Sequence, residues 1–190
     1  MLDAPEVAAR VLALYPPERL EEAAKRFSYR RGDLPFPFFD GFRARGYLPK
    51  EQLVWIVDWK TAGRQRRNAE LNSDDLVRQA TQGAFQKAQR NTSAAVEELS
   101  KLKGVAIAVS SAVLTAWNPQ EFGIIDRWAW DALRNITQDR DVIGQKSGTL
   151  FRPEQYAHYI KALRELKKHT GMNCHDLDKA LWMLGKRYDR

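Results

Sequence analysis

Apolar residues recur at spacings of three and four along almost the whole chain, and no alternating apolar and polar segment of useful length interrupts them. Spacings of three and four place side chains on one face of an α-helix, whereas a half-buried strand needs strict alternation. The chain of 190 residues also has no internal repeat and no low-complexity tract. The sequence therefore predicts an all-α fold.

Composition narrows the class of protein. At 44% hydrophobic residues the chain can bury a full core, and its formal net charge of +7 suits an anionic partner. No apolar run approaches the roughly 20 residues of a membrane-spanning helix, and the first residues lack a secretory signal pattern. We therefore expect a soluble, cytoplasmic protein that does not bind membranes and is a monomer.

Cysteine and histidine usage predicts no metal site and no cofactor. Cys174 is the only cysteine, which excludes an intramolecular disulfide, a thiolate zinc site and a four-cysteine iron-sulfur cluster. The three histidines are His158, His169 and His175, and Gly171 separates the last two. One helical face cannot hold both as ligands, so we expect solvated surface histidines.

Start and stop signals divide the chain into helices of ordinary length. Residues 34–42 contain four of the eight Phe residues with two Pro and one Gly, which predicts an ordered apolar loop. We expect two parts, an N-terminal helical and aromatic-loop segment (1–50) and a helical domain (51–190). The expected helices cover 7–14, 18–27, 50–60, a helix capped by 72–75, 94–102, 127–133, a helix from Pro153 to just before Gly171, and a last helix capped by Asn173.

Residues 99–117 predict a helix, a tight turn and a second helix. Gly104 permits the unusual backbone of the turn, and the small residues after it let two helices approach closely. The first amides of the second helix form a potential anion site. Further along, the apolar pair Ile124 and Ile125 precedes Asp126, which opens another helix.

At these residues the sequence resembles the helix-hairpin-helix DNA glycosylase superfamily, which includes endonuclease III and the 8-oxoguanine glycosylases. Leu102-Lys103-Gly104-Val105-Ala106 matches the family hairpin, and Ile124-Ile125-Asp126 matches the segment that ends in the catalytic Asp, 22 positions after Gly104. The resemblance centres on 94–133 and extends over 51–190. Residues 1–50 match no named family.

The resemblance implies roles for individual residues, with duplex DNA as the partner. Asp126 is the expected catalytic carboxylate, which stabilises the oxocarbenium character of the sugar of a flipped nucleotide. The hairpin amides are expected to hold a phosphate, and the basic run 60–68 to enter the duplex beside the extruded base. The DNA-binding residues implied are Lys103, Gly104, Val105, Ala106, Ala108, Arg64, Arg66 and Arg67.

Departures from the family pattern narrow the expected activity. Ala108 stands where bifunctional members carry a nucleophilic Lys, so Schiff-base lyase chemistry of the usual kind is not expected. Lys103 replaces the hairpin Pro, and Ala106 replaces the second Gly. The sequence thus suggests a monofunctional DNA N-glycosylase that excises a damaged or modified base, in DNA repair or in defence against modified phage DNA.

Each of these features also has a plainer interpretation. Asp126 can serve only as a helix N-cap, Gly104 only as a helix C-cap, and the basic run only as a solvated loop. The aromatic residues 36–42, with Trp55 and Trp182, are more typical of a core than of a base-stacking pocket. Two alternatives stay open on this basis: a catalytically silent helix-hairpin-helix DNA-binding protein, and a helical interaction protein with a structural hairpin.

Overall fold

The computed structural model describes residues 2–29, 31–39, 41–138 and 151–187. Within these ranges the regular elements are α-helices and one 3-10 turn, so the all-α prediction is confirmed. None of the helices described is long and apolar enough to cross a membrane. The elements are α1 (Ala4–Leu14), α2 (Pro17–Arg26), η1 (Phe36–Phe39), α3 (Phe42–Arg45), α4 (Lys50–Thr61), α5 (Arg66–Glu70), α6 (Asp74–Ala88), α7 (Thr92–Leu99), α8 (Ile107–Trp117), α9 (Arg127–Thr137), α11 (Pro153–Thr170) and α12 (Cys174–Arg187).

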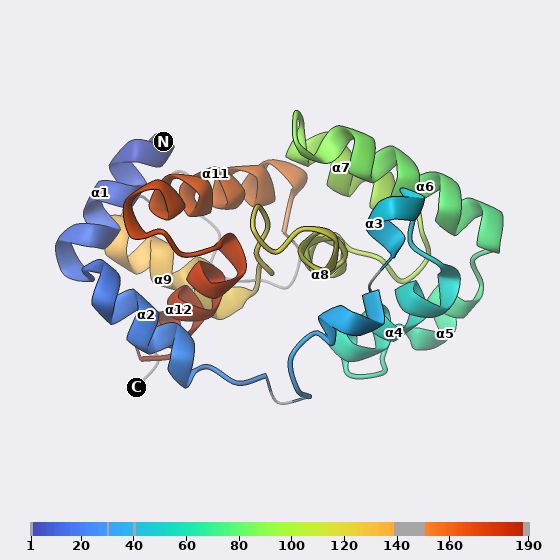
Figure 1. Ribbon diagram of the computed structural model, residues 1–190, viewed down its shortest axis with the longest axis horizontal. Coiled ribbons are helices and arrows are strands. Elements are labelled where there is room, and N and C mark those ends of the chain that lie inside the picture. The colour runs from blue at the N-terminus through green and yellow to red at the C-terminus, as the bar shows by residue number, and fades with distance from the viewer. Residues whose placement is uncertain (1, 30, 40, 139–150, 188–190) are drawn as a thin grey trace.

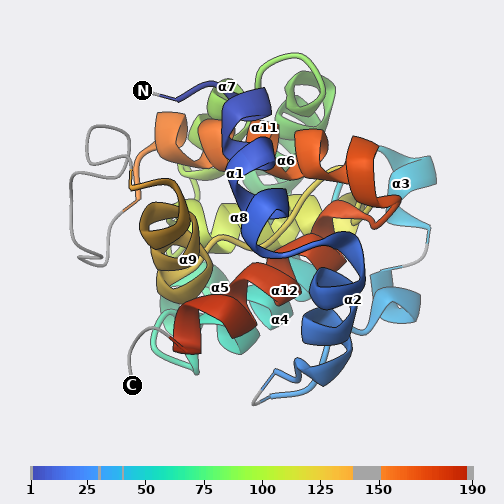
Figure 2. The same ribbon diagram turned by 90° about the vertical axis from the view of Figure 1, so that its left-hand side faces the viewer.

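The helices form two groups with α8 between them (Figure 1). In one group α12 packs against α9 and α2, while α1 packs against α11 and α9. In the other, α6 packs against α7, and α4 packs against α5 and α8. Figure 2 shows α1 and α2 lying across the C-terminal helices α11 and α12. Both ends of the chain therefore build the same group of helices.

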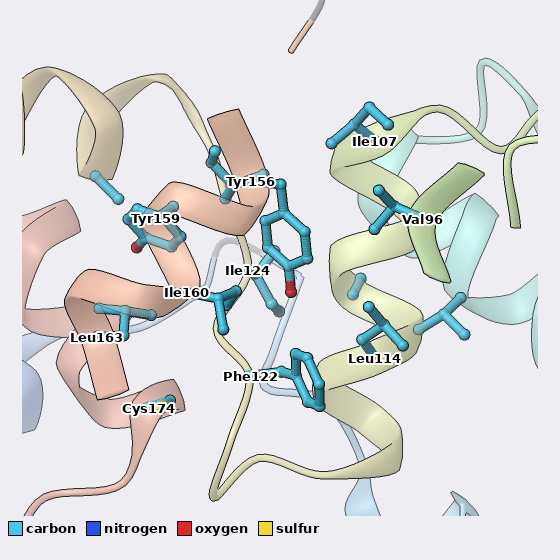
Figure 3. Close-up of a cluster of buried hydrophobic side chains, with 14 of the residues drawn as sticks. Val96, Ile107, Leu114, Phe122, Ile124, Tyr156, Tyr159, Ile160, Leu163 and Cys174 are labelled. Atoms are coloured by element: carbon cyan, nitrogen blue, oxygen red, sulfur yellow. The ribbon is translucent and has the colours of Figure 1, made fainter. Parts of the chain in front are cut away.

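One continuous hydrophobic core joins the two groups. Tyr156 and Phe122 lie between α8 and α11, with Leu114 on one side and Ile160 on the other (Figure 3). Val11 of α1 is fully buried in the same core. Residues on both sides of position 50 thus contribute to a single core, which an isolated set of N-terminal helices could not bury.

The predicted boundaries of three helices need correction, and the helix expected over 127–133 continues as α9 to Thr137. The first helix begins at Ala4 and not at residue 7, because Asp3 caps it and accepts a hydrogen bond from the Glu6 N–H at 2.9 Å. The expected helix 94–102 runs instead over Thr92–Leu99, since Asn91 is its N-cap and the turn begins at Ser100. The turn therefore starts earlier than the periodicity suggested.

The apolar segment 34–42 is more regular than the expected loop. It contains the 3-10 turn η1, and Phe42 at its end begins the short helix α3. Phe39 and Phe42 are buried, as a role in the core predicts, whereas Phe38 is exposed. Gln52 of α4 donates a hydrogen bond to the Phe38 carbonyl at 2.6 Å, which ties the turn to the helix.

Candidate active site

Asp126 is the N-cap of α9, as the sequence predicted. Its Oδ1 accepts a hydrogen bond from the Ala129 N–H at 3.1 Å, and its backbone is extended. Among the residues described, nothing bonds to Oδ2. The side chain is half-buried. One carboxylate oxygen therefore remains available to a ligand.

Buried contacts hold the segment before Asp126 in place. The Tyr156 hydroxyl donates to the Gly123 carbonyl at 3.1 Å, and the Ile124 N–H donates to the Asp178 carboxyl. A Cβ atom on Gly123 would lie 2.7 Å from Leu163 Cδ1 and 2.8 Å from Asp178 Cβ. Only glycine fits this approach, so α11 and α12 together fix the path that leads into Asp126.

Helix α12 also approaches the first turn of α9. A Cβ atom on Gly185 would lie 1.9 Å from the Trp128 carbonyl oxygen. Real side chains do not tolerate such a distance, so the absence of a side chain at Gly185 lets the two helices meet backbone to backbone. This contact sets the position of the turn that begins at Asp126.

Asp126 lines a pocket of about 380 Å³, called the Asp126 pocket below. This volume lies within the range of roughly 300–1,000 Å³ typical of small-molecule sites. Three separate segments build it: the connection after α2, the end of α4 and the start of α9. Its lining residues are Tyr29, Arg31, Trp59, Lys60, Ala62 and Asp126. The lining thus comes from both helical groups, from α4 in one and from the start of α9 in the other.

Several polar atoms of the lining are already engaged. Trp59 Nε1 donates to the Gly32 carbonyl at 3.0 Å. Arg31 donates to the Asp58 carbonyl at 2.9 Å and to its carboxylate at 3.3 Å. Trp59 therefore has no free donor for a ligand, whereas both bonds of Arg31 come from Nη1 and leave its other N–H groups without a partner among the described residues.

Two other polar groups of the lining lack a partner. The Tyr29 hydroxyl is buried and has no hydrogen bond. Lys60 forms no ion pair or hydrogen bond with any residue that the structure describes, although it is close enough to Asp178 to favour the charged form of that carboxyl. The Lys60 ammonium and one Asp126 carboxylate oxygen are therefore unpaired among the described residues that line the Asp126 pocket, whereas the Tyr29 hydroxyl is buried.

Asp178 lies behind Asp126 in the core. Burial, and to a smaller extent the negative charge of Asp126, raise its pKa to about 8. Its Oδ1 accepts a hydrogen bond from the Tyr159 hydroxyl at 2.5 Å. Asp178 is therefore mostly protonated at neutral pH, which removes a like charge from beside Asp126.

His175 overturns the expectation that the histidines are solvated. It is 3% exposed, stacks on Tyr29 with ring centroids 6.1 Å apart, and meets the edge of Phe36. Both ring nitrogens lack partners among the residues described. Burial lowers its pKa to about 3, with a smaller contribution from the Lys179 charge, so the ring is neutral. His169 is exposed, as expected.

The hairpin turn packs tightly on α5. Gly104 has φ +81°, and a Cβ atom there would lie 3.0 Å from the Gln65 carbonyl oxygen and 3.1 Å from the Ala69 nitrogen. Asn72, which is buried, donates to the Lys103 carbonyl at 3.0 Å and accepts from the Lys103 N–H at 2.9 Å. Glycine is thus needed for both the backbone angle and the close approach.

The hairpin leaves several amides unpaired at the start of α8. Ala106 is the N-cap and provides no side-chain cap. The N–H groups of Gly104, Ala106, Ile107 and Ala108 donate no hydrogen bond to any described residue. Val105 is different, because its side chain is buried and its N–H donates to the Leu102 carbonyl at 3.2 Å. The turn therefore offers amides to an anion, and Val105 belongs to the core.

The basic run lies beside the hairpin. Arg66 pairs with Glu70 at 2.9 Å and with Asp58 at 3.7 Å, while Arg64 and Arg67 are exposed and unpaired among the described residues. Since Gly104 contacts the backbone of Gln65, the hairpin and the basic run form one surface. Ala62 extends this surface to the Asp126 pocket.

Sequence reasoning missed most of the pocket. It placed Lys60 only in a basic run and gave no role to Tyr29, Arg31 or Asp178. Unpaired polar groups in a cavity are visible only after folding, so no local signal identified them.

Within the described residues, no group of three or more His, Cys, Asp or Glu is placed to hold a metal ion. Compared with family models, curated proteins and solved structures, the chain gives no match.

Proposed function

We propose that this protein is a monofunctional DNA N-glycosylase, which flips a damaged or modified base out of duplex DNA and hydrolyses its N-glycosidic bond. One observation carries the proposal. Asp126, the residue that resembles the family's catalytic Asp, lines a pocket with Lys60 and Ala62 of the basic run, and Gln65 of the same run contacts Gly104 of the hairpin. The elements needed to hold a duplex and to act on a flipped nucleotide therefore lie next to one another.

The chemistry assigned to Asp126 follows from the bond that breaks. The electron pair of the C1′–N bond leaves with the base, and positive charge develops on the sugar. The free Oδ2 of Asp126 stabilises that charge and accepts a proton from the attacking water, whose oxygen bonds to C1′. The product is an abasic strand and a free base.

The hairpin has a separate task in this proposal. Its unpaired amides at Gly104, Ala106 and Ala108 bind a backbone phosphate, with the exposed Lys103 beside them. Arg64 and Arg67 contact the duplex nearby. Phosphate contacts position the DNA without selecting a sequence, as a search for rare altered bases requires.

A panel of duplexes tests the proposal. Each duplex carries one oxidised, alkylated, deaminated, hydroxymethylated or glucosylated base, and alkali after incubation cleaves the strand at any abasic site. Release of at least one altered base supports the proposal. Activity confined to hydroxymethylated or glucosylated bases indicates defence against modified phage DNA, whereas activity on damaged bases indicates repair.

A catalytically silent DNA-binding protein is the second candidate. The N-cap hydrogen bond from Ala129 gives Asp126 a structural role that requires no chemistry. Binding of duplexes without release of any base from the panel would favour this candidate over the glycosylase.

A further inference from the structure

The unpaired groups of the Asp126 pocket indicate which bases it accepts. We propose that the pocket takes an uncharged base bearing a ring carbonyl, of the deaminated or oxidised class, and that the Lys60 ammonium contacts that carbonyl oxygen as the base departs. This inference rests on the proposed function. The inference adds a substrate class and a specificity-determining residue to the proposed function.

Two cations lie in the described lining of the pocket. Arg31 is ion-paired with Asp58 at 3.3 Å, whereas Lys60 has no ion-pair partner among the described residues. Among the described lining residues Asp126 is the only carboxylate, and its free oxygen is needed at the sugar. In this proposal the sugar therefore meets the Asp126 carboxylate, and the base meets the Lys60 ammonium.

The chemistry of the leaving group favours an ammonium beside the carbonyl oxygen of the base. When the C1′–N bond of an uncharged base breaks, the bond electrons leave with the base and produce an anion whose charge spreads onto the ring carbonyl oxygens. An ammonium group at that oxygen stabilises the anion and can supply the proton that the free base finally carries. An alkylated purine with a positive charge leaves as a neutral molecule, so it gains nothing from Lys60 and is repelled by it.

Two walls of the pocket are aromatic. The rings of Trp59 and Tyr29 meet edge to face, with their centroids 5.0 Å apart. Aromatic walls suit a planar base of any kind, so Lys60 rather than stacking decides between charged and uncharged bases.

The test compares excision rates on duplexes that carry uracil, hypoxanthine, 8-oxoguanine, 3-methyladenine or 7-methylguanine, with spontaneous release subtracted. We expect the wild-type protein to release one or more of the first three bases faster than the two alkylated bases. Lys60→Gln should lower release of the carbonyl-bearing base by about a hundredfold, while Lys60→Arg keeps the preference. Uracil or hypoxanthine as the best substrate identifies the deaminated class, and 8-oxoguanine the oxidised class.

Lys50→Gln is the matched control, because Lys50 begins the same helix roughly 15 Å from Lys60 at 1.5 Å per residue. It should leave the rates unchanged. Faster release of alkylated bases by the wild-type protein, or an unchanged rate in Lys60→Gln, would overturn this inference while excision itself stands.

A second measurement separates the inference from the proposed function. Binding is measured with duplexes in which the altered nucleotide carries a 2′-fluorine, which suppresses cleavage. If no base is ever released but a carbonyl-bearing base still tightens binding through Lys60, the pocket assignment stands and the glycosylase proposal falls. If neither release nor such a binding preference is found, both are overturned.

Discussion

At the scale of single residues, Asp126 combines a structural and a proposed chemical role that one substitution can separate. Asn caps a helix about as well as Asp, so Asp126→Asn should keep the fold and DNA binding. Loss of the negative charge beside C1′ should lower base excision by about a hundredfold or more, or ~3 kcal/mol. Excision rates on a confirmed substrate, with melting temperature and DNA affinity, measure both effects.

Asp3→Asn is the matched control for this experiment. Asp3 is also an N-cap whose carboxylate accepts a backbone hydrogen bond, but it lies at the start of α1 and does not line the Asp126 pocket. Its substitution should change neither excision nor binding. Excision by Asp126→Asn at the wild-type rate would reduce Asp126 to a helix cap.

Ala108 supports a second prediction at this scale. Strand cleavage by β-elimination needs an amine that forms an imine with the sugar aldehyde, and position 108 provides none. We therefore expect an intact abasic strand after base release and no covalent adduct on treatment with borohydride. An adduct that disappears in Lys60→Gln would identify Lys60 as such an amine and make the enzyme bifunctional.

At the scale of elements, the contact between α12 and α9 controls where Asp126 lies. Gly185→Ala places a methyl group against the Trp128 carbonyl and must push the helices apart, at a cost of roughly 1–3 kcal/mol. Urea unfolding should show this loss, and excision should fall because the first turn of α9 moves.

Gly83→Ala on α6 is the control, since its Cβ meets only the flexible Glu98 side chain. This variant should be neutral or gain up to ~1 kcal/mol. Equal stability of the two variants would show that the α12 contact is not tight.

The hairpin permits a test of DNA binding at the same scale. Lys103 is exposed and unpaired among the described residues, whereas Lys101 pairs with Glu98 at 2.5 Å. If Lys103 neutralises one phosphate, Lys103→Gln should reduce the slope of log affinity against log salt by about one unit, without changing base preference. Lys101→Gln should leave the slope nearly unchanged. Binding that does not depend on salt would favour the protein-interaction alternative.

At the scale of the whole molecule, two buried groups predict how stability depends on pH. Asp178 keeps its proton in the folded state up to about pH 8 but ordinarily loses it near 3.8, so its contribution to stability is full below 3.8 and is lost as the pH rises to 8. His175 binds a proton near 6.5 when exposed but only near 3 when folded, so its contribution is lost as the pH falls between these values.

The two slopes cancel where they overlap. From these groups we expect a flat free energy of unfolding between about pH 4 and 6.5, with a fall of up to about 1.4 kcal/mol per pH unit from there to pH 8. Urea unfolding at a series of pH values from about 4 to 8 measures this free energy of unfolding. Asp178→Asn should remove the fall above pH 6.5 and expose the His175 slope, so that stability falls as the pH is lowered from 6.5 to 4. His175→Phe should expose the Asp178 slope, so that stability falls from about pH 4 up to pH 8. Profiles identical to the wild type would mean that neither group is buried as described.

Much of the fold could be predicted from the sequence because its signals are local. Helical periodicity, the cap at Asp126, the glycine of the hairpin and the stop at Gly171 each depend on residues within one or two turns. The same locality explains the errors. Asp3 and Asn91 are caps that compete with nearby alternatives, so the two helix starts were misplaced by a few residues.

Only the tertiary structure decided what surrounds Asp126. Tyr29, Lys60 and Asp126 line one pocket although they come from distant parts of the chain. The burial of His175 and Asp178 likewise depends on which helices cover them. Whether a polar group is paired, solvated or buried is set by contacts between remote segments, which no local pattern encodes. The sequence alone therefore determined the helices, the hairpin turn and the cap, while packing determined the pocket and the charge within it.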